Sequence, residues 1–382
     1  HTEYSLLDGV ASISSLVDKA MADGMPGMAI TDHGNMFGIK EYFNYVNKKN
    51  GKTLGAIKDA KKALEKAKAD GDSEAAATAE AEIAKLQKKI FKPIFGCEMY
   101  VAQKSLHEHV DKKDTGRHLI VLAKNETGYH NLVKLVSKAW TEGFYSHART
   151  DKSELAKHNE GLIVCSACLG GEIPRLLQAG QYEEADRQVA WFKETFGDDY
   201  YIELQRHKAT VPRANHNVYE LQKQIEPKLI ELARKHNIKI VASNDVHFAN
   251  EEDSEAHDRL ICLSTNKLLN DEGRMLYTKQ EWLKSSEEMS SLFADLPEAI
   301  SNTVELLDKV ETYCIDHPPI MPNFEIPASF GTEAEYRSRI TEKELFDEFT
   351  QDENGNVVLS EEDAKAKIKK LGGYEKLYRI KF

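Results

Sequence analysis

The chain has 382 residues, a formal net charge of −12 and five cysteines, so it is long enough for one large domain with an appendage or for two domains. The acidic balance excludes the broad basic surface of a free-standing DNA-binding protein and suits metal binding. Because the cysteines are odd in number and scattered, and no apolar stretch approaches membrane-spanning length, we expect a soluble protein of the reducing cytoplasm with no membrane partner.

Strand and helix patterns alternate along most of the chain. A helical pattern over Ser12–Ala22 precedes an apolar strand that starts at Gly27 and ends in Thr31-Asp32-His33-Gly34. Further strands are predicted at 93–102, 117–123, 161–164, 200–204 and from 238 onward, with helices at 128–140, 182–196 and 218–236. This alternation predicts an α/β fold with a parallel sheet and crossover helices. A (β/α) barrel fits better than an open sheet, because polar residues recur at strand ends from all over the chain.

Residues 51–92 interrupt this alternation. Ala56–Ala69 and Ser73–Ile90 are rich in Ala, Lys and Glu and place apolar residues at helical spacing, with a turn and cap at 71–73. We predict a helical hairpin inserted in the barrel. In a parallel barrel it would project from the face opposite the strand-end rim, so it either docks a partner or is simply solvated, and catalysis should not need it.

The barrel pattern stops after about residue 285. We therefore expect a barrel domain over 1–285 and a second region over 286–382. In this second region, Ser286–Val310 predicts two helices and Cys314–Pro327 is extended and rich in proline, while Glu333–Phe382 is charged and helical around a turn at 353–356.

Metal-binding side chains gather at the predicted strand ends. The run from Ile238 to Phe248 begins as an apolar strand and finishes with Asp245 and His247, whose side chains would leave the same face of an extended chain. The full set is His1, Asp8, His33, Glu98, His118, Cys168, Asp245 and His247. All are residue types that bind zinc, manganese or iron, and eight are too many for one ion. We predict two or three divalent metals that share a bridging carboxylate, most plausibly Glu98.

Clustered cations suit phosphoester hydrolysis, because they lower the pKa of a bound water and neutralise the charge that develops on the phosphate. Arg206, His207 and Lys208, after another strand, are candidates for holding the phosphate.

Cys168 is predicted as a metal thiolate, although Cys165 on the same strand is an alternative and a small buried residue would also fit either position. Cys97 should point into the core. The remaining histidines, among them His147, His236 and His257, lie in polar loops or helices and are predicted at the surface.

Several motifs together resemble a known family. They are His1-Thr-Glu-Tyr-Ser-Leu-Leu-Asp8-Gly9, Thr31-Asp32-His33-Gly34, Gly96-Cys97-Glu98, Arg117-His118-Leu119, Asn244-Asp245-Val246-His247, Thr127–Leu135 and Cys168–Ile173. In this order the chain resembles the polymerase and histidinol phosphatase (PHP) domain at the amino terminus of the alpha subunits of bacterial DNA polymerase III. The family's fold is a distorted TIM-like (β/α)7 barrel with three metals, and the resemblance implies that 286–382 begins the polymerase palm.

The resemblance also implies a ligand assignment. Glu98 would bridge two metals, one held by His118 and Cys168 and the other by His1 and Asp245, while Asp8, His33 and His247 would hold a third. We accordingly take Glu98, Asp245 and His247 as the catalytic residues. The family opens with His-x-His, and His1 corresponds to the second of these histidines, so the first is absent from this sequence as given.

The activity implied for this region is metal-dependent 3′–5′ phosphodiester hydrolysis of a single-stranded DNA end, of the proofreading type, with other polymerase III holoenzyme subunits as partners. No paired aspartates on a strand follow residue 285, so nucleotide addition would belong to the whole polymerase. Two alternatives stay open: a stand-alone phosphatase for a small phosphate ester, of histidinol phosphatase type, and a scaffold whose metals only stabilise the polymerase or its proofreading partner.

Overall fold

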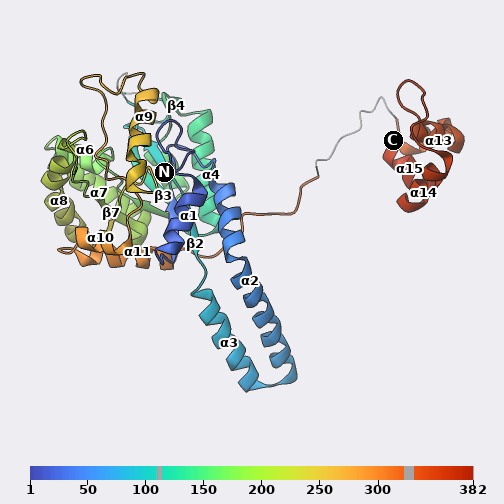
Figure 1. Cartoon of the computed structure of the whole chain (residues 1–382), viewed down its shortest axis with the longest axis horizontal. Coiled ribbons are helices and arrows are strands. Elements are labelled where there is room, and N and C mark those ends of the chain that lie inside the picture. Colours follow the sequence, from blue (N-terminus) through green and yellow to red (C-terminus); the bar gives the residue numbers. More distant parts are fainter. Residues whose placement is uncertain (109, 111–113, 322–330, 382) are drawn as a thin grey trace. The chain divides into compact units, whose positions relative to one another are not determined.

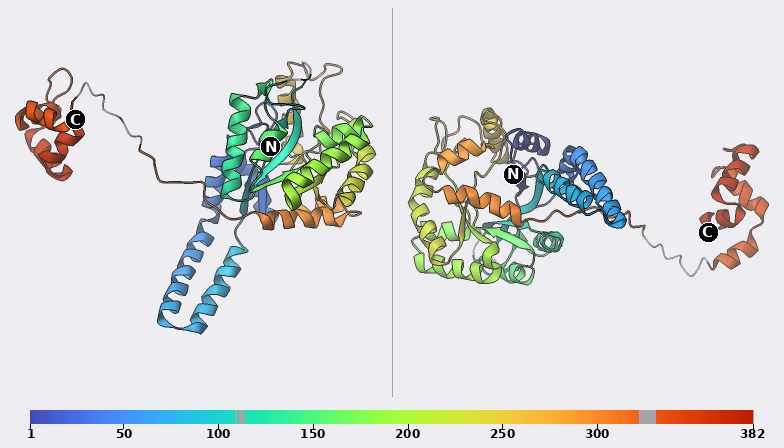
Figure 2. Two further views of the ribbon diagram at one scale, coloured as in Figure 1. Left: turned by 180° about the vertical axis from the view of Figure 1, so that it is seen from behind. Right: turned by 90° about the horizontal axis from the view of Figure 1, so that it is seen from below.

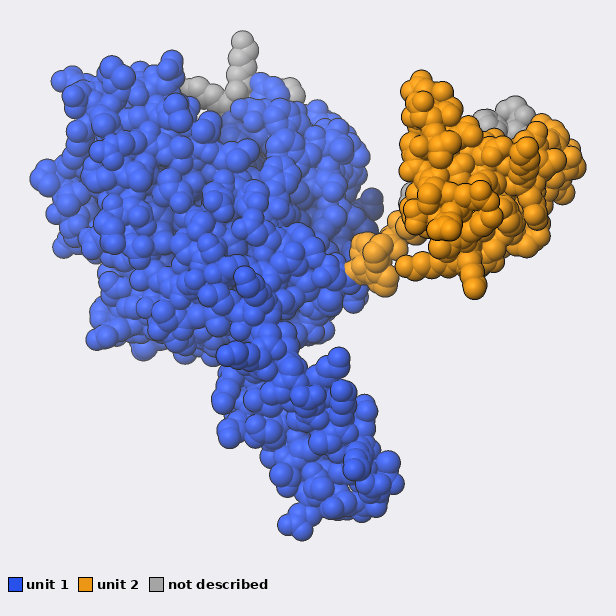
Figure 3. Space-filling view, turned by 45° about the vertical axis from the view of Figure 1, so that its right-hand side comes forward, with its two compact units in different colours: residues 1–316 blue, residues 317–382 orange. Residues whose placement is uncertain are grey.

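The computed structural model describes residues 1–108, 110, 114–321 and 331–381. By its contacts the chain divides into two compact units, His1–Asp316 and His317–Phe382, which Figure 3 colours blue and orange. Among the described helices, none is both long and apolar enough to cross a membrane.

A curled, eight-stranded sheet forms the centre of the first unit (Figure 1). Its strands are β1 (Gly27–Ile30), β2 (Lys92–Val101), β3 (Arg117–Ala123), β4 (Phe144–Tyr145), β5 (His147–Thr150), β6 (Leu162–Cys165), β7 (Tyr200–Leu204) and β8 (Lys239–Ala242). Their order is β4-β5-β2-β3-β6-β7-β8, with β1 paired to β2. The mixed α/β architecture confirms the predicted distorted barrel. β1 and β8 are not paired with each other in the described sheet, so the barrel has an open seam.

The strand–helix alternation predicts a parallel sheet, but the sheet in the structure is mixed. β3 runs antiparallel to both β2 and β6, whereas β1–β2, β2–β5, β6–β7 and β7–β8 are parallel pairs. The described residues of the connection from β2 to β3 form no crossover helix, in keeping with an antiparallel pair. As a result His118, near the start of β3, lies opposite Tyr100, near the end of β2.

Alternate residues of each strand face two different cores, as the pleat requires. Val121 packs outward against the surrounding helices, while Leu122 faces the interior of the barrel. Leu306 and Leu307 of α11 (Pro297–Lys309) join the interior cluster. The boundary that we predicted at residue 285 therefore falls inside the first unit. Figure 2 shows α10 (Ser286–Leu292) and α11, in orange, across one end of this unit.

The other helices of the barrel are α1 (Ile13–Ala22), α4 (Glu126–Thr141), α5 (Lys152–Lys157), α6 (Glu172–Gln178), α7 (Tyr182–Phe196), α8 (Asn217–Lys235) and α9 (Ser254–Ser264), with short 3-10 turns at Gly197–Asp199 and Glu251–Asp253. Along the chain, α1 precedes the first strand, α9 follows the last, and the rest lie between strands. Local capping fixes where several begin. The Ser12 hydroxyl accepts from the Ser15 amide at α1, and the Asn125 side chain accepts from the Gly128 amide at α4.

The predicted hairpin is present as α2 (Ile39–Asp70) and α3 (Ser73–Gln87), and Figure 1 shows it projecting from the barrel. α2 begins earlier than predicted, because the helix after His33 continues into the insertion without a break. Gly71 ends α2 with φ 73°, and the Asp72 side chain caps α3. Since β1 and β2 pair at Gly27 and Lys92, the hairpin is attached where these strands begin, away from their carboxyl ends.

The second unit is a small helical domain with α12 (Glu333–Arg339), α13 (Glu342–Thr350), α14 (Glu361–Leu371) and α15 (Tyr374–Lys381). Leu345, Ile368 and Leu377 form its core. A turn at 352–356 joins α13 to α14, as predicted. Of the predicted extended segment Cys314–Pro327, residues 314–321 contain neither helix nor strand, and residues 322–327 lie outside the described residues.

Candidate metal centre

The predicted metal ligands from distant parts of the sequence lie together in the first unit. Within the described residues, two groups have ligand atoms within 4.8 Å of one another: one is His1, His33 and His247, and the other is Glu98, His118 and Cys168. Ion-pair distances link the two remaining residues to these groups, since Asp245 lies 3.3 Å from His1 and Asp8 lies 3.1 Å from His33. Loops at strand ends therefore converge on one centre, as in other barrels.

Glu98 on β2 is the carboxylate shared by both groups. Its side chain is buried, and Oε1 accepts a hydrogen bond from Nδ1 of His118 at 2.8 Å. Oε2 contacts Nδ1 of His33 and lies 3.9 Å from Nε2 of His1. Burial opposes ionisation, but the charges and hydrogen bonds of His118 and His33 outweigh it and hold the Glu98 pKa well below its usual range. Glu98 is thus a buried carboxylate with three imidazoles around it.

The hydrogen bonds behind His1 determine which of its nitrogens faces the centre. The Ser5 hydroxyl donates its single hydrogen to Oδ1 of Asp32 at 2.7 Å, so it can only accept from Nδ1 of His1, 2.9 Å away. Nδ1 therefore carries the hydrogen, and Nε2 of neutral His1 has a free lone pair. That lone pair faces the carboxylates of Glu98 and Asp245.

His247 is oriented in the same way. Its Nδ1 donates to the backbone carbonyl of Asp245 at 2.7 Å, and a carbonyl can only accept. Nε2 is buried, has no hydrogen-bond partner among the described residues, and lies 3.6 Å from Oδ2 of Asp8. A buried lone pair facing a carboxylate is unfavourable unless a cation lies between them.

Asp8 collects a third set of contacts. Its Oδ2 lies 3.1 Å from Nε2 of His33, and its Oδ1 lies 3.2 Å from Nε2 of His257. The Tyr277 hydroxyl donates to Oδ2 at 2.9 Å. Burial again opposes ionisation of Asp8, but the nearby imidazoles of His247, His257 and His33 outweigh it and lower the Asp8 pKa. Burial likewise lowers the pKa of His33, and the negative charges of Glu98 and Asp8 outweigh it and raise that pKa to about 10.

His257 and Tyr277 were not among the predicted site residues, and the surface position predicted for His257 is wrong. Its side chain is 2% exposed. A signal was present in the sequence, because His257 lies four residues before Ile261 and five before Cys262, and these residues share the buried face of α9.

Cys168 joins the centre and Cys165 does not. The Cys168 sulfur lies 3.5 Å from Nδ1 of His118 and accepts from the Gly170 amide at 3.4 Å. Cys165 is packed in the interior apolar cluster, and Cys97 is buried in the outer core, as predicted. Burial raises the pKa of the Cys168 thiol well above its usual range, and nearby Asp245 and Glu98 add to this effect. The thiol is therefore protonated unless a cation compensates the thiolate charge.

Backbone strain accompanies several of these side chains. Asp245 itself has φ 47°, Leu7 before Asp8 has φ 62°, and Ala167 before Cys168 has φ 63°. Residues other than glycine seldom adopt this left-handed conformation, and it concentrates at functional sites. Asp245 is therefore not on an extended strand, because β8 ends at Ala242. Our reason for pairing it with His247 was wrong, although both side chains reach the centre.

The structure does not bring the predicted phosphate ligands to the centre. The Arg206 guanidinium donates to both carboxylate oxygens of Glu226 and of Asp295, so its hydrogen-bonding capacity is used within the fold. His207 is buried, with Nε2 bonded to the Asn244 carbonyl at 3.1 Å. Lys208 is exposed. Arg206 in particular links neighbouring elements and is not available to a phosphate.

A groove of about 630 Å³ opens beside the centre. It is lined by Cys168, His207, Asp245 and Tyr277, together with polar residues 215–217 at the start of α8. This groove connects solvent with the residues that could hold cations.

The sequence matches a family and several named proteins. The model of the PHP domain family matches residues 1–207, which is more than half of the chain. The chain is 39% identical over 345 residues to the DNA polymerase III subunit alpha of Borreliella burgdorferi, covering 89% of this chain and 26% of that protein. For the same subunit of Treponema pallidum the identity is 36% over 379 residues (98% and 27%), and for that of Thermus aquaticus it is 34% over 360 residues (89% and 25%).

The chain thus spans about a quarter of the length of the curated relatives that it matches. The part matched by the family model contains six of the eight predicted ligands, and Asp245 and His247 follow it. A curled α/β sheet with a converging set of histidines and carboxylates accompanies this match. The chain belongs to the PHP domain family.

Proposed function

We propose that the centre binds two or three divalent cations and that the chain hydrolyses a phosphodiester bond at a 3′ end of single-stranded DNA. The observation that supports this most directly is the orientation of His1 and His247. The Nδ1 of His1 donates to the Ser5 hydroxyl, and the Nδ1 of His247 donates to the Asp245 carbonyl. Each imidazole therefore turns the lone pair of its Nε2 toward a carboxylate in a buried site. Such an arrangement suits metal ligands held by an outer layer of hydrogen bonds.

The donor set fits transition-metal cations. Imidazoles with carboxylates and one thiol accept zinc, manganese or iron. We propose that His118 and Cys168 hold one cation and His1 and Asp245 a second, with Glu98 between them. Asp8, His33 and His247 would hold a third, and His257 is a candidate ligand beside Asp8 because their atoms are 3.2 Å apart.

Cations bound there would lower the pKa of a bound water and neutralise charge on the phosphate. The residues of the chain position the ligands and admit the substrate. Glu98 positions the imidazoles of His33 and His118, and the Tyr277 hydroxyl holds Asp8. The groove beside Asp245 admits the strand end.

The names of the relatives support a proposal about the larger protein. Because the matched proteins are named DNA polymerase III subunit alpha, we propose that this chain is the amino-terminal PHP region of such a replicative polymerase, with DNA and other holoenzyme subunits as partners. Residues 286–382 would then lead toward the polymerase palm, and nucleotide addition would require the whole subunit. The hairpin α2–α3 is not needed for hydrolysis in this proposal.

The test is release of nucleotides from a 3′-labelled single strand by the purified chain, with and without added manganese or zinc. We expect metal-dependent release that falls by at least about 10²-fold in Asp245→Asn. His236→Asn is the matched control, because that imidazole pairs with Asp186 outside the centre. If the metal-loaded chain releases no nucleotide, the hydrolytic role is excluded and the centre is a scaffold. If it cleaves only small phosphate esters, it is a phosphatase.

A further inference from the structure

The interior of the barrel contains a cavity of about 540 Å³ that reaches the metal centre from within. Apolar side chains of the inner sheet face and of α10 and α11 form most of its wall. The titratable residues that line it are His1, Glu98, Cys165, Cys168, Glu203, Asp245 and Lys284. Of these, Cys165, Glu203 and Lys284 have no role in the proposed metal site, and Cys165 is packed in the interior apolar cluster. This interior cavity and the groove through which a substrate would enter share Cys168, Gln205 and Asp245 as lining residues, so they lie on two sides of the same centre.

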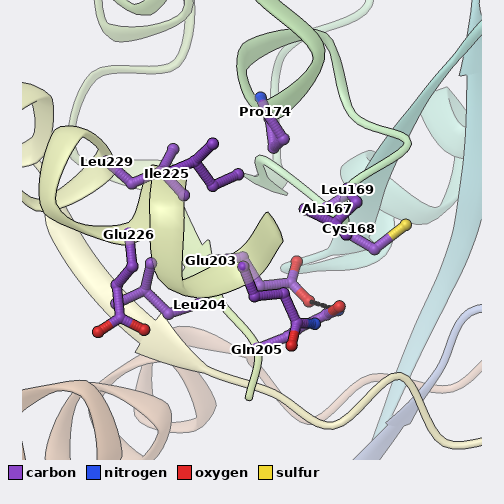
Figure 4. A pocket seen from close by; sticks show the side chains of 11 residues that line it. Ala167, Cys168, Leu169, Pro174, Glu203, Leu204, Gln205, Ile225, Glu226 and Leu229 are labelled. Atoms are coloured by element: carbon purple, nitrogen blue, oxygen red, sulfur yellow. Dashed lines mark hydrogen bonds between the residues drawn. The ribbon is translucent and has the colours of Figure 1, made fainter. Parts of the chain in front are cut away.

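Glu203 lies on β7 and points inward, with 7% of its surface exposed. Its Oε1 accepts hydrogen bonds from Nε2 of Gln205 at 3.1 Å and from the Ser243 hydroxyl. Figure 4 shows the pair formed by Glu203 and Gln205. The other oxygen, Oε2, is buried and has no hydrogen-bond partner within the described part of the chain. No ion pair with Glu203 is formed by any described lysine, arginine or histidine.

The surroundings of Oε2 favour a carboxylic acid over a carboxylate. An ionised oxygen with neither donor nor cation is costly in a buried site. Gln205 Oε1 and Asn244 Oδ1 are also buried acceptors that have no partner among the residues the structure describes, and both residues line the interior cavity. The Asn244 amide group cannot be flipped to turn its Nδ2 into the cavity, because Nδ2 donates to the carbonyls of Gln280 and Trp282. A proton on Oε2 removes the negative charge and turns this unpaired acceptor into a donor.

We propose that Glu203 holds a proton on Oε2 at the inner side of the metal centre and releases it to solvent when cations occupy that centre. The O–H bond of the carboxylic acid breaks, and the resulting carboxylate is compensated by the added positive charge. The inference rests on the proposed function, since it requires the centre to bind cations. Glu203 is a proton-holding residue here, and it is not a ligand.

The electrostatics agree with this geometry. Burial raises the pKa of Glu203 to about 7, and the negative charges of Asp245 and Glu98 add to the increase, while hydrogen bonds from Ser243 and Gln205 act against it. Lys284, which lines the same cavity, does not pair with Glu203, and burial lowers its pKa to about 8. Cations near Asp245 and Glu98 cancel the charges that favour the protonated form.

The experiment counts protons released on cation binding. The metal-free chain is titrated calorimetrically with zinc or manganese in buffers of different ionisation enthalpy, at about pH 6 and about pH 8.5. At pH 6 the wild type should release about 0.9 proton more than Glu203→Gln, because a group with pKa 7 is about nine-tenths protonated there. At pH 8.5 the difference should vanish, and both proteins should bind the same number of cations.

Glu226→Gln is the matched control, because Glu226 lines the same small pocket as Glu203 in Figure 4 but is paired with Arg206. It should release as many protons as the wild type. Equal proton counts for the wild type and Glu203→Gln at pH 6, with full cation loading, would overturn the proposal. A smaller number of bound cations in Glu203→Gln would also overturn it, since Glu203 would then be a ligand.

Failure of the wild type to bind any cation would instead remove the proposed function, and this inference with it. A second measurement does not depend on the variant. Infrared difference spectra of the wild type on cation addition at pH 6 should show the loss of a protonated carboxyl band. Retention of that band by the loaded protein would contradict proton release.

Discussion

Nε2 of His1 stands 3.3 Å from Oδ1 of Asp245, so the first residue of the chain and a loop after the last strand of the barrel meet at one point. The His1 amino group already donates to the Val246 carbonyl, and a cation bound at this point would add a second link across the seam between β1 and β8. Cation binding should therefore stabilise the fold, by about 2.7 kcal/mol when free cation exceeds the Kd 100-fold.

Differential scanning calorimetry with and without a chelator measures this effect as a rise in Tm of a few degrees. The rise should shrink in Asp245→Asn and persist in His236→Asn. An unchanged Tm in a protein shown to contain its cations would contradict the idea that they add a link across the seam.

Ser5→Ala should weaken cation binding although Ser5 is not a ligand. Its hydroxyl accepts from Nδ1 of His1 and so keeps the Nε2 lone pair directed at the centre. Loss of such an outer contact costs about 10- to 100-fold in metal affinity. Competition with a chromogenic chelator gives the Kd. Ser12→Ala is the control, because it removes the cap of α1 and should cost about 1 kcal/mol of stability with the Kd unchanged.

Arg206→Ala should destabilise the fold and leave substrate affinity unaltered. The guanidinium joins Glu226 of α8 to Asp295 between α10 and α11, and its removal leaves both carboxylates without a partner. We expect a loss of about 2 kcal/mol in urea unfolding. Arg187→Ala, which breaks an exposed pair with Glu184, should change stability far less. A raised KM for DNA with normal stability would restore the phosphate-binding hypothesis.

Lys284 should make stability rise with pH in the alkaline range. Burial lowers its folded-state pKa to about 8, below the ordinary 10.5 of the unfolded chain. Between these values the unfolded state binds more protons than the folded state, so the free energy of unfolding increases from about pH 8 to pH 10.5. Lys284→Met should remove that increase. Urea unfolding across this pH range decides the matter, and parallel curves for the two proteins would disprove it.

Removal of the hairpin should spare the metal centre. No residue of α3 is buried, and the base of the hairpin is closed by hydrogen bonds between Asn50 and Phe91. A chain in which residues 55–86 are replaced by a short Gly/Ser linker should keep its cation content, measured by elemental analysis, and its Tm within a few degrees. A large loss of bound cation would show that the insertion supports the rim.

Strand ends were the informative signal in the sequence. In a barrel the carboxyl ends of parallel strands meet on one face, so the sequence pattern alone predicts that His33, Glu98 and Cys168 lie close together. It could not supply the direction of β3, because a strand and its reverse have the same apolar pattern. Because β3 is antiparallel to β2, His118 lies at the centre although it is near the start of its strand.

The errors concern interactions between residues far apart in the sequence. Arg206 has the composition of a phosphate ligand, and nothing near it in the sequence reveals Glu226 or Asp295 as its partners, 20 and 89 residues away. His257 lies on a helix and not at a strand end, so the strand-end pattern did not indicate it, although its helical spacing with Ile261 indicates burial. The sharp turn at Asp245 depends on a left-handed backbone conformation, which residue identity alone does not predict for aspartate.

The two halves of the centre differ in when they can form during synthesis. Glu98 and His118 belong to neighbouring antiparallel strands, so they can meet as soon as that part of the chain leaves the ribosome. His1 has to wait until Asp245 and Val246 have emerged. The first residues can bond Asp32 early, through Thr2 and Ser5, but the contacts of His1 with residues 245 and 246 form only after β8 has been made. The order of translation would therefore set the order in which the proposed cation sites are completed.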